Sequence, residues 1–181
     1  IEDFLSKQEA LDILKKEHVS YKIARPDLLE FTIQEFFETK CFGNTFLIKK
    51  CYKIFDIPFF FSWKKILESA KFPEYKKQIL TFVNLFKANG YFENNLKDIL
   101  RKAKKEPLLY VIYAIYLLYE TDKESSGTLD FDDIILKTTL YLKEHACTLP
   151  YKLLIIDEFQ DTSLCRFQFV QEILKQTDAS L

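Results

Sequence analysis

Residues Leu153–Thr162 read LLIIDEFQDT, and this stretch decides which fold the C-terminal part of the chain adopts. Its apolar residues stand between the polar Lys152 and the acidic pair Asp157 and Glu158. A short apolar run without alternation is typical of a strand buried on both faces of a parallel sheet. The sequence therefore predicts one buried strand near residues 152–157, with two carboxylates at its carboxyl end, the edge at which α/β sheets bind ligands.

Helix patterns fill most of the remaining chain, as expected for a sequence with only 3 Gly and 5 Pro. Capping residues, prolines and apolar spacing predict the individual helices. They are expected over residues 6–17, 26–37, 44–57, 62–72, 73–90, 94–105 and 107–119, from 129 onward, and from 162 or 163 onward. The polar stretch Thr121–Thr128 is predicted to be a loop or hinge. The fold class is thus mainly α, with a partial α/β element near residues 152–157.

Composition limits the classes of protein that the chain can represent. At 181 residues it is too short for a complete large motor enzyme, and 48% hydrophobic residues exclude a disordered or collagen-like chain. With 26 basic and 27 acidic residues, the net charge of −1 gives no overall attraction to nucleic acid. We find no apolar run of the roughly 18 residues that a membrane span needs, so a soluble protein without membrane partners is expected.

The cysteines indicate the cellular compartment, and the first residue leads us to expect a longer parent protein. None of the four cysteines has CxxC spacing or a nearby His partner, so reduced, mostly buried thiols in a cytoplasmic protein are expected at Cys41, Cys51, Cys147 and Cys165. The chain begins at Ile1 and shows no signal-like segment. We therefore expect an excised piece of a longer protein.

Charge is distributed unevenly along the chain. The segment from Lys71 to Lys105 holds nine basic residues against three acids, a net charge of +6. Two interpretations remain open: solvated helix faces, or a surface that contacts phosphates. Aromatic residues interleave with these charges, and their helical spacing predicts that most of them lie in the core: Tyr75, Phe82, Phe86, Tyr91 and Phe92.

The acidic pair after the predicted strand has a clear use in a nucleoside triphosphatase. Asp157 would hold Mg²⁺, a hard ion that prefers oxygen ligands and keeps several waters. Glu158 would orient and deprotonate the water that attacks the γ-phosphate. Apolar residues followed by two acids are common in unrelated strands, and the following FQDT is what makes the signal specific.

The stretch Asp157–Thr162 resembles motif II of the UvrD/Rep family of superfamily 1 DNA helicases at all six positions of DEFQDT. A second match, Leu129–Ile135, is similar to the DFxxL-type segment through which these enzymes return from a helical insertion to the first RecA-like domain. A softer match, Phe82–Gly90, is similar to the segment before DFxxL in the helicase IV-like branch.

This resemblance implies a domain organisation and a function. Residues 1–128 would form the helical insertion called subdomain 1B, and residues 129–181 part of the RecA-like ATPase domain 1A with its Walker B acids. The parent would be an ATP-dependent helicase that couples Mg-ATP hydrolysis to the unwinding of duplex DNA at a single-strand/duplex junction, with the missing helicase domains in the same chain.

The resemblance also implies roles for individual residues, each carried over by position. Asp157 would be the Mg²⁺ ligand and Glu158 the general base, while Gln160 and Asp161 would belong to the nucleotide pocket. Asp130 and Phe131 would shape the junction between 1A and 1B, although a purely structural role is equally open for these last four residues. The candidate DNA contact is the lysine cluster Lys102, Lys104 and Lys105.

One departure from the family pattern limits what the chain does alone. A phosphate-binding loop needs paired glycines followed by Lys-Thr or Lys-Ser, but Gly43, Gly90 and Gly127 lie far apart and none precedes a lysine. The arginine finger and the second RecA-like domain are also missing. We expect the isolated chain to be catalytically inactive and to hold neither Mg²⁺ nor ATP tightly. Without sheet neighbours, the strand at 152–157 should be exposed, paired with a second copy, or poorly ordered.

Two other classes of function compete with the helicase interpretation. A metal-dependent nuclease would use Asp157, Glu158 and Asp161 as ligands. A helical DNA- or protein-binding module would use DEFQDT only as an acidic loop. A phosphate-binding loop encoded upstream of Ile1 would favour the helicase.

Overall fold

The computed structural model describes Asp12, Leu14, Leu149, Lys152 and Gln160, together with residues 21–103, 106–145, 154–156 and 162–177. The chain divides into two compact units. Unit 1 contains residues 1–24, 87–90 and 126–181, and unit 2 contains residues 25–86 and 91–125. Each unit is described by itself below.

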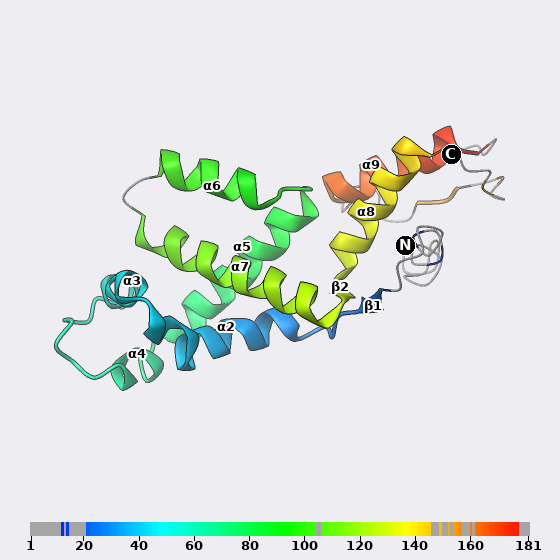
Figure 1. The fold of residues 1–181 in the computed structure, drawn as a ribbon. Helices are drawn as coiled ribbons and strands as arrows, with labels where there is room; N and C mark the ends of the chain where they lie inside the picture. The colour runs from blue at the N-terminus through cyan, green and yellow to red at the C-terminus, as the bar shows by residue number, and fades with distance from the viewer. Residues whose placement is uncertain are drawn as a thin grey trace. The chain divides into compact units, whose positions relative to one another are not determined.

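The described part of the chain is mainly α-helical, which confirms the predicted fold class (Figure 1). In chain order the elements are β1 (Lys22–Ile23), α2 (Leu28–Glu38), the short 3-10 helix η2 (Lys40–Gly43), α3 (Thr45–Phe55), α4 (Lys64–Leu67), α5 (Phe72–Ala88), α6 (Glu93–Lys102), α7 (Pro107–Ser126), β2 (Thr128–Leu129), α8 (Phe131–Glu144) and α9 (Leu164–Lys175). Among the described residues, no helix has both the length and the apolar content required to cross a bilayer.

Unit 2 is a set of helices around an aromatic core. Phe37 lies at its centre, 1% exposed, and its ring packs edge-on against the rings of Phe36, Phe55 and Phe72. Edge-to-face packing suits aromatic rings because the positive edge of one ring meets the negative face of the other. Trp63 ties the start of α4 to this core, because its indole N–H donates to the Phe37 carbonyl at 2.7 Å.

The aromatic residues interleaved with the basic segment divide between core and surface. Phe86 is buried, and Tyr75 and Phe82 pack half-buried against the core of unit 2. Tyr91 and Phe92 are about half exposed, at 47% and 49%. The prediction that most of these aromatic residues lie in the core is therefore confirmed, with the two residues that follow Gly90 as exceptions.

Helix α7 corrects one prediction. The stretch 121–128 was predicted to be a loop or hinge, but α7 continues to Ser126. Thr121 donates its hydroxyl to the Leu117 carbonyl at 2.8 Å, and Lys123 is 2% exposed and pairs with Glu120 at 2.9 Å. These side chains satisfy their polar groups along the helix, so their polarity does not end it. The helix ends instead at Gly127, whose φ of 61° few other residues adopt.

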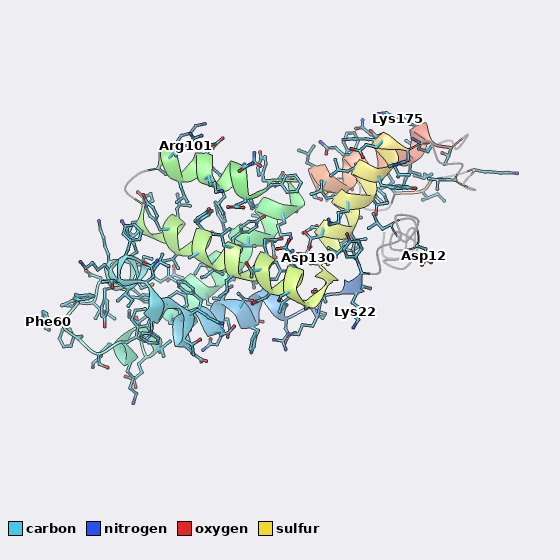
Figure 2. The ribbon with its side chains drawn as sticks, in the orientation of Figure 1. Asp12, Lys22, Phe60, Arg101, Asp130 and Lys175 are labelled. Carbon is cyan, nitrogen blue, oxygen red and sulfur yellow. The ribbon has the colours of Figure 1, made fainter. Side chains whose placement is uncertain are left out.

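Unit 1 contains a two-stranded parallel sheet that was not predicted from the sequence. Strand β1 pairs with β2 in the register Lys22 with Thr128 and Ile23 with Leu129. Flanking backbone hydrogen bonds extend the pairing, including one from the Ala24 N–H to the Leu129 carbonyl at 2.8 Å. Figure 2 labels Lys22 on β1 and Asp130 beside β2. Two residues per strand give too short a pattern for periodicity to detect.

The described cysteines are buried free thiols, as predicted. Cys41, Cys51 and Cys165 are all buried and form no disulfide within the described part of the chain. The sulfurs of Cys41 and Cys51 lie 3.8 Å apart, within hydrogen-bonding distance for thiols. Burial raises the pKa of the Cys165 thiol to about 11, so this group stays protonated at neutral pH. Cys147 lies outside the described residues.

Candidate functional site

The segment that carries the predicted catalytic acids is only partly described. Asp157, Glu158 and Asp161 lie outside the described residues, and Gln160 is exposed. Before them, Leu154 is buried in a hydrophobic cluster of unit 1, whereas Ile155 is 67% exposed. The segment is therefore anchored to the hydrophobic cluster of unit 1 through Leu154.

The strand predicted near residues 152–157 is not formed at its described positions. Lys152 lies in a bend, and residues 154–156 have no regular secondary structure. The exposure of Ile155 agrees with the expectation that this segment lacks sheet neighbours. A parallel strand forms only when hydrogen-bonding partners flank it, and an apolar sequence pattern does not supply them.

Helix α9 follows this segment and packs against α8. The Ser163 side chain caps α9 by accepting from the Arg166 N–H at 3.4 Å, which confirms the predicted helix start. Both helices and the preceding segment contribute to one hydrophobic cluster. Its buried members are Ile135, Leu142, Leu149, Leu154, Cys165, Phe169 and Ile173. The cluster therefore fixes Leu154, three residues before Asp157, against the two helices.

The start of α8 is held by reciprocal hydrogen bonds between two acids. The Asp130 carboxylate accepts from the Asp133 N–H at 2.9 Å, and the Asp133 carboxylate accepts from the Asp130 N–H at 3.1 Å. This capping box satisfies backbone donors that the first turn of a helix leaves unpaired. Acids are also favoured at this end of a helix by its dipole. Asp130 thus acts as the N-cap of α8, and Phe131 is the first helical residue.

Lys87, at the end of α5, binds both acids of this capping box. Its ammonium lies 2.6 Å from Asp130 Oδ2 and 2.6 Å from Asp133 Oδ1, and the residue is only 7% exposed. A buried ammonium is costly without partners, and here two carboxylates supply them. All three residues belong to unit 1, in which Lys87–Gly90 are fixed to the start of α8.

The sequence did not predict the role of Lys87, which was counted in the basic segment Lys71–Lys105 as part of either a solvated helix face or a phosphate-contacting surface. A usable signal was present in its spacing along α5. Ile79 and Val83, the residues eight and four positions earlier, are fully buried, so Lys87 continues the apolar stripe of the helix. A charged residue among the buried apolar positions of a helix indicates that the fold supplies a partner of opposite charge.

A small hollow lies where α8, α9 and the 154–156 segment meet. It is a cavity of about 60 Å³, and Thr162 and Arg166 are among the residues that line it. The Arg166 guanidinium also stacks over the Phe131 ring at 5.1 Å. Within the described part of the chain, neither Thr162 Oγ1 nor Arg166 Nε has a hydrogen-bond partner. Thr162 is also the last residue of DEFQDT.

The ionisation of Asp132, in the first turn of α8, is disfavoured. Burial raises the pKa of its carboxyl above the usual range, and the charge of Asp130 raises it further, while Lys87 and Arg166 act in the opposite direction. The charged form of Asp132 therefore costs free energy in the folded chain.

Replacing Asp132 by asparagine is expected to raise the free energy of unfolding at pH 7 but not at pH 3. Because the folded pKa lies above the ordinary value of 3.8, the unfolded chain loses its proton first as the pH rises, and folding becomes less favourable. The gain should appear between about pH 4 and pH 7. Urea unfolding of both proteins across this range measures it, and a difference that does not change with pH would contradict the expectation.

The predicted DNA-contacting lysines are only partly described. Lys102 is exposed and is the last residue of α6 in unit 2. Lys104 and Lys105 lie outside the described residues. The neighbouring Arg101 pairs with Asp98 on the same helix, which offsets part of the positive charge at this end.

Comparison with known proteins identifies the family. Residues 5–181 match the domain described as the UvrD/REP helicase N-terminal domain. The chain therefore belongs to the UvrD/Rep helicase family, as the DEFQDT motif indicated.

The chain is also similar to a curated protein from fission yeast, the "ATP-dependent DNA helicase srs2" of Schizosaccharomyces pombe (strain 972 / ATCC 24843). The two are 35% identical over 88 residues, which is 48% of this chain and 10% of that protein. The matched region thus spans about a tenth of the relative's length. No solved structure matches the chain.

Proposed function

We propose that the chain is part of an ATP-dependent DNA helicase or translocase that couples Mg-ATP hydrolysis to the unwinding of duplex DNA. The observation that carries this proposal is DEFQDT directly after an apolar run, in a chain of the UvrD/Rep helicase family. The similarity to a fission yeast protein named as an ATP-dependent DNA helicase supports the same activity.

The residues of the motif suit Mg²⁺ and a nucleotide. Asp157 and Glu158 supply adjacent carboxylates, the hard oxygen donors that Mg²⁺ prefers. In the proposed function Asp157 holds the ion, which neutralises phosphate charge when bound. Glu158 accepts the proton of the attacking water. Gln160 and Asp161 belong to the same nucleotide pocket.

The remaining parts of the proposed motor lie elsewhere in the same protein. We propose that residues 1–128 form the helical insertion and residues 129–181 belong to the ATPase domain, with Asp130 and Phe131 at the junction. The glycines support the absence of a phosphate-binding loop from this chain, because Gly90 and Gly127 have φ values of 72° and 61° and end α5 and α7. The 181-residue chain alone is therefore expected not to hydrolyse ATP. The buried free thiols favour action in the cytoplasm.

ATP hydrolysis by the intact protein, with and without single-stranded DNA, tests this proposal. A translocase hydrolyses ATP faster when DNA is bound, because strand engagement completes its cycle. Hydrolysis that needs Mg²⁺ and rises with DNA would support the proposal. Magnesium-dependent DNA cleavage without ATP hydrolysis would instead identify the nuclease, and DNA binding without either reaction would identify a binding module.

The lysine cluster Lys102, Lys104 and Lys105 is our proposed phosphate contact. Changing all three to glutamate is expected to weaken duplex binding and to reduce the slope of affinity against salt, because fewer counterions are released. Fluorescence anisotropy across a salt series measures both quantities. An unchanged affinity at every salt concentration would place the phosphate contact elsewhere.

A further inference from the structure

Three consecutive phenylalanines project from unit 2 in the loop between α3 and α4. Phe59, Phe60 and Phe61 are 54%, 83% and 44% exposed, and we call them the aromatic tip. Figure 2 shows Phe60 at the outer end of this loop, pointing away from the helices. Single exposed apolar residues are ordinary, but three adjacent exposed rings form a patch that a protein surface rarely leaves uncovered.

The loop is built to hold the tip in this position. The Phe61 N–H donates to the Pro58 carbonyl at 3.0 Å, which closes a turn across the three rings. Tyr52 anchors this turn to α3, because its hydroxyl donates to the Phe61 carbonyl at 2.6 Å and its ring packs edge-on against Phe59. The Phe60 and Phe61 rings are then left side by side, 4.8 Å apart. Exposure of the tip is therefore part of the local fold.

The sequence on both sides of the aromatic tip is strongly basic. Between Lys40 and Lys71 the sequence holds seven lysines and two acids, a net charge of +5. Lys49, Lys53 and Lys65 are exposed and form no ion pair within the described part of the chain. An exposed lysine keeps its charge available for an anionic partner. The tip thus combines flat apolar rings with positive charges on neighbouring elements.

This combination suits one class of ligand, an unpaired nucleic-acid strand. Bases stack on aromatic rings, and the phosphates beside them are attracted to lysines. In a duplex the faces of the bases are covered by their neighbours, so Phe rings reach them only where the strand is unpaired. A neutral apolar partner would cover the rings but would leave the lysines without a counterpart.

We propose that the aromatic tip stacks against unpaired DNA bases while Lys49, Lys53 and Lys65 contact the adjacent phosphates. The choice of DNA rests on the proposed helicase function. This contact is separate from the proposed cluster around Lys102 and has a different chemistry, because it depends on ring faces as well as on charge.

The test uses the 181-residue chain and a single-stranded oligonucleotide that contains 2-aminopurine, whose fluorescence falls when the base stacks. Phe60→Ala is expected to lower the affinity about tenfold and to reduce the quenching. Phe60→Tyr, which keeps the ring, should retain both. Phe31→Ala is the matched control, because Phe31 is also about half exposed, at 51%, but lies on α2. Circular dichroism checks that all the variants fold.

The salt dependence separates stacking from charge. Phe60→Ala should lower the affinity by the same factor at every salt concentration, whereas Lys53→Gln should reduce the salt slope by about one contact. A fully paired duplex should bind without sensitivity to Phe60.

Two results would overturn the inference. If wild type and Phe60→Ala bind single strands equally and quench equally, or if neither binds, the tip does not stack on bases. If Phe60→Ala instead abolishes self-association or binding to anionic vesicles, the tip belongs to a protein or lipid contact. The proposed function is judged separately by DNA-stimulated ATP hydrolysis of the intact protein carrying Phe60→Ala, so either proposal can fail alone.

Discussion

Replacing Lys87 by methionine is expected to lower the free energy of unfolding of the chain by about 3 kcal/mol. Methionine keeps most of the length and volume of the side chain but removes the ammonium. The carboxylates of Asp130 and Asp133 would then lose the ammonium that lies 2.6 Å from each of them. Removing one partner of a largely buried ion pair costs far more than removing an exposed pair, because the charge that remains stays poorly solvated.

Urea unfolding followed by circular dichroism measures this effect. Lys77→Met is the matched control, because Lys77 is an exposed residue of the same helix α5 and should change stability by less than about 0.5 kcal/mol. A loss below about 1 kcal/mol for Lys87→Met would mean that the two acids do not depend on the lysine. In that case the ion pairs between Lys87 and the acids at the start of α8 would contribute little to the free energy of unfolding.

Replacing Glu158 by glutamine is expected to reduce ATP hydrolysis by the intact protein about 100-fold or more. Glutamine has nearly the same shape but does not accept a proton from the attacking water. Nucleotide and DNA binding should remain, since the change affects the chemical step. Asp157, the proposed Mg²⁺ ligand, is untouched in this variant.

The comparison needs a control glutamate outside the DEFQDT motif. Glu144 is exposed at the end of α8, so Glu144→Gln should hydrolyse ATP at the wild-type rate. The two variants differ from wild type by the same loss of one charge. Equal rates in Glu158→Gln and Glu144→Gln would remove Glu158 from the catalytic role, and another group would then have to accept the proton of the attacking water.

Capping residues made the helices predictable from sequence. Asn44 accepts from the Phe46 N–H at 3.0 Å, and Asp130 and Ser163 cap α8 and α9 in the same manner. Such caps act within a few residues, so a single sequence contains the whole signal. The family was equally accessible, because six consecutive residues of DEFQDT form a specific pattern.

The errors arose where structure depends on distant residues. The expected strand at 152–157 needs neighbouring strands, and Ile155 is 67% exposed. Lys123 seemed to belong to a polar loop, but it is buried on α7 and paired with Glu120. Lys87 was counted in the basic segment without a partner of its own. Its two acid partners, Asp130 and Asp133, lie more than 40 residues further along the chain. For the strand and for Lys87 the deciding contact lies outside the window over which periodicity is judged. For Lys123 the partner Glu120 is only three residues away, and the polar residues of this stretch concealed the helix.

The basic segment also proved longer than the sequence interpretation allowed. The segment Lys71–Lys105 is preceded by residues 39–70, which hold six more lysines and the exposed phenylalanines. Only the structure showed that Phe60 points outward, since the turn at Pro58 and the anchor at Tyr52 decide its direction.

Strand separation by the intact protein tests the central claim most directly. The measurement follows release of a labelled strand from a DNA duplex with a single-stranded tail, in Mg²⁺ with either ATP or a non-hydrolysable ATP analogue. The helicase assignment predicts release with ATP, none with the analogue, and none from Glu158→Gln with ATP. Release that proceeds equally with the analogue, or that survives in Glu158→Gln, would contradict the claim that hydrolysis at DEFQDT drives unwinding.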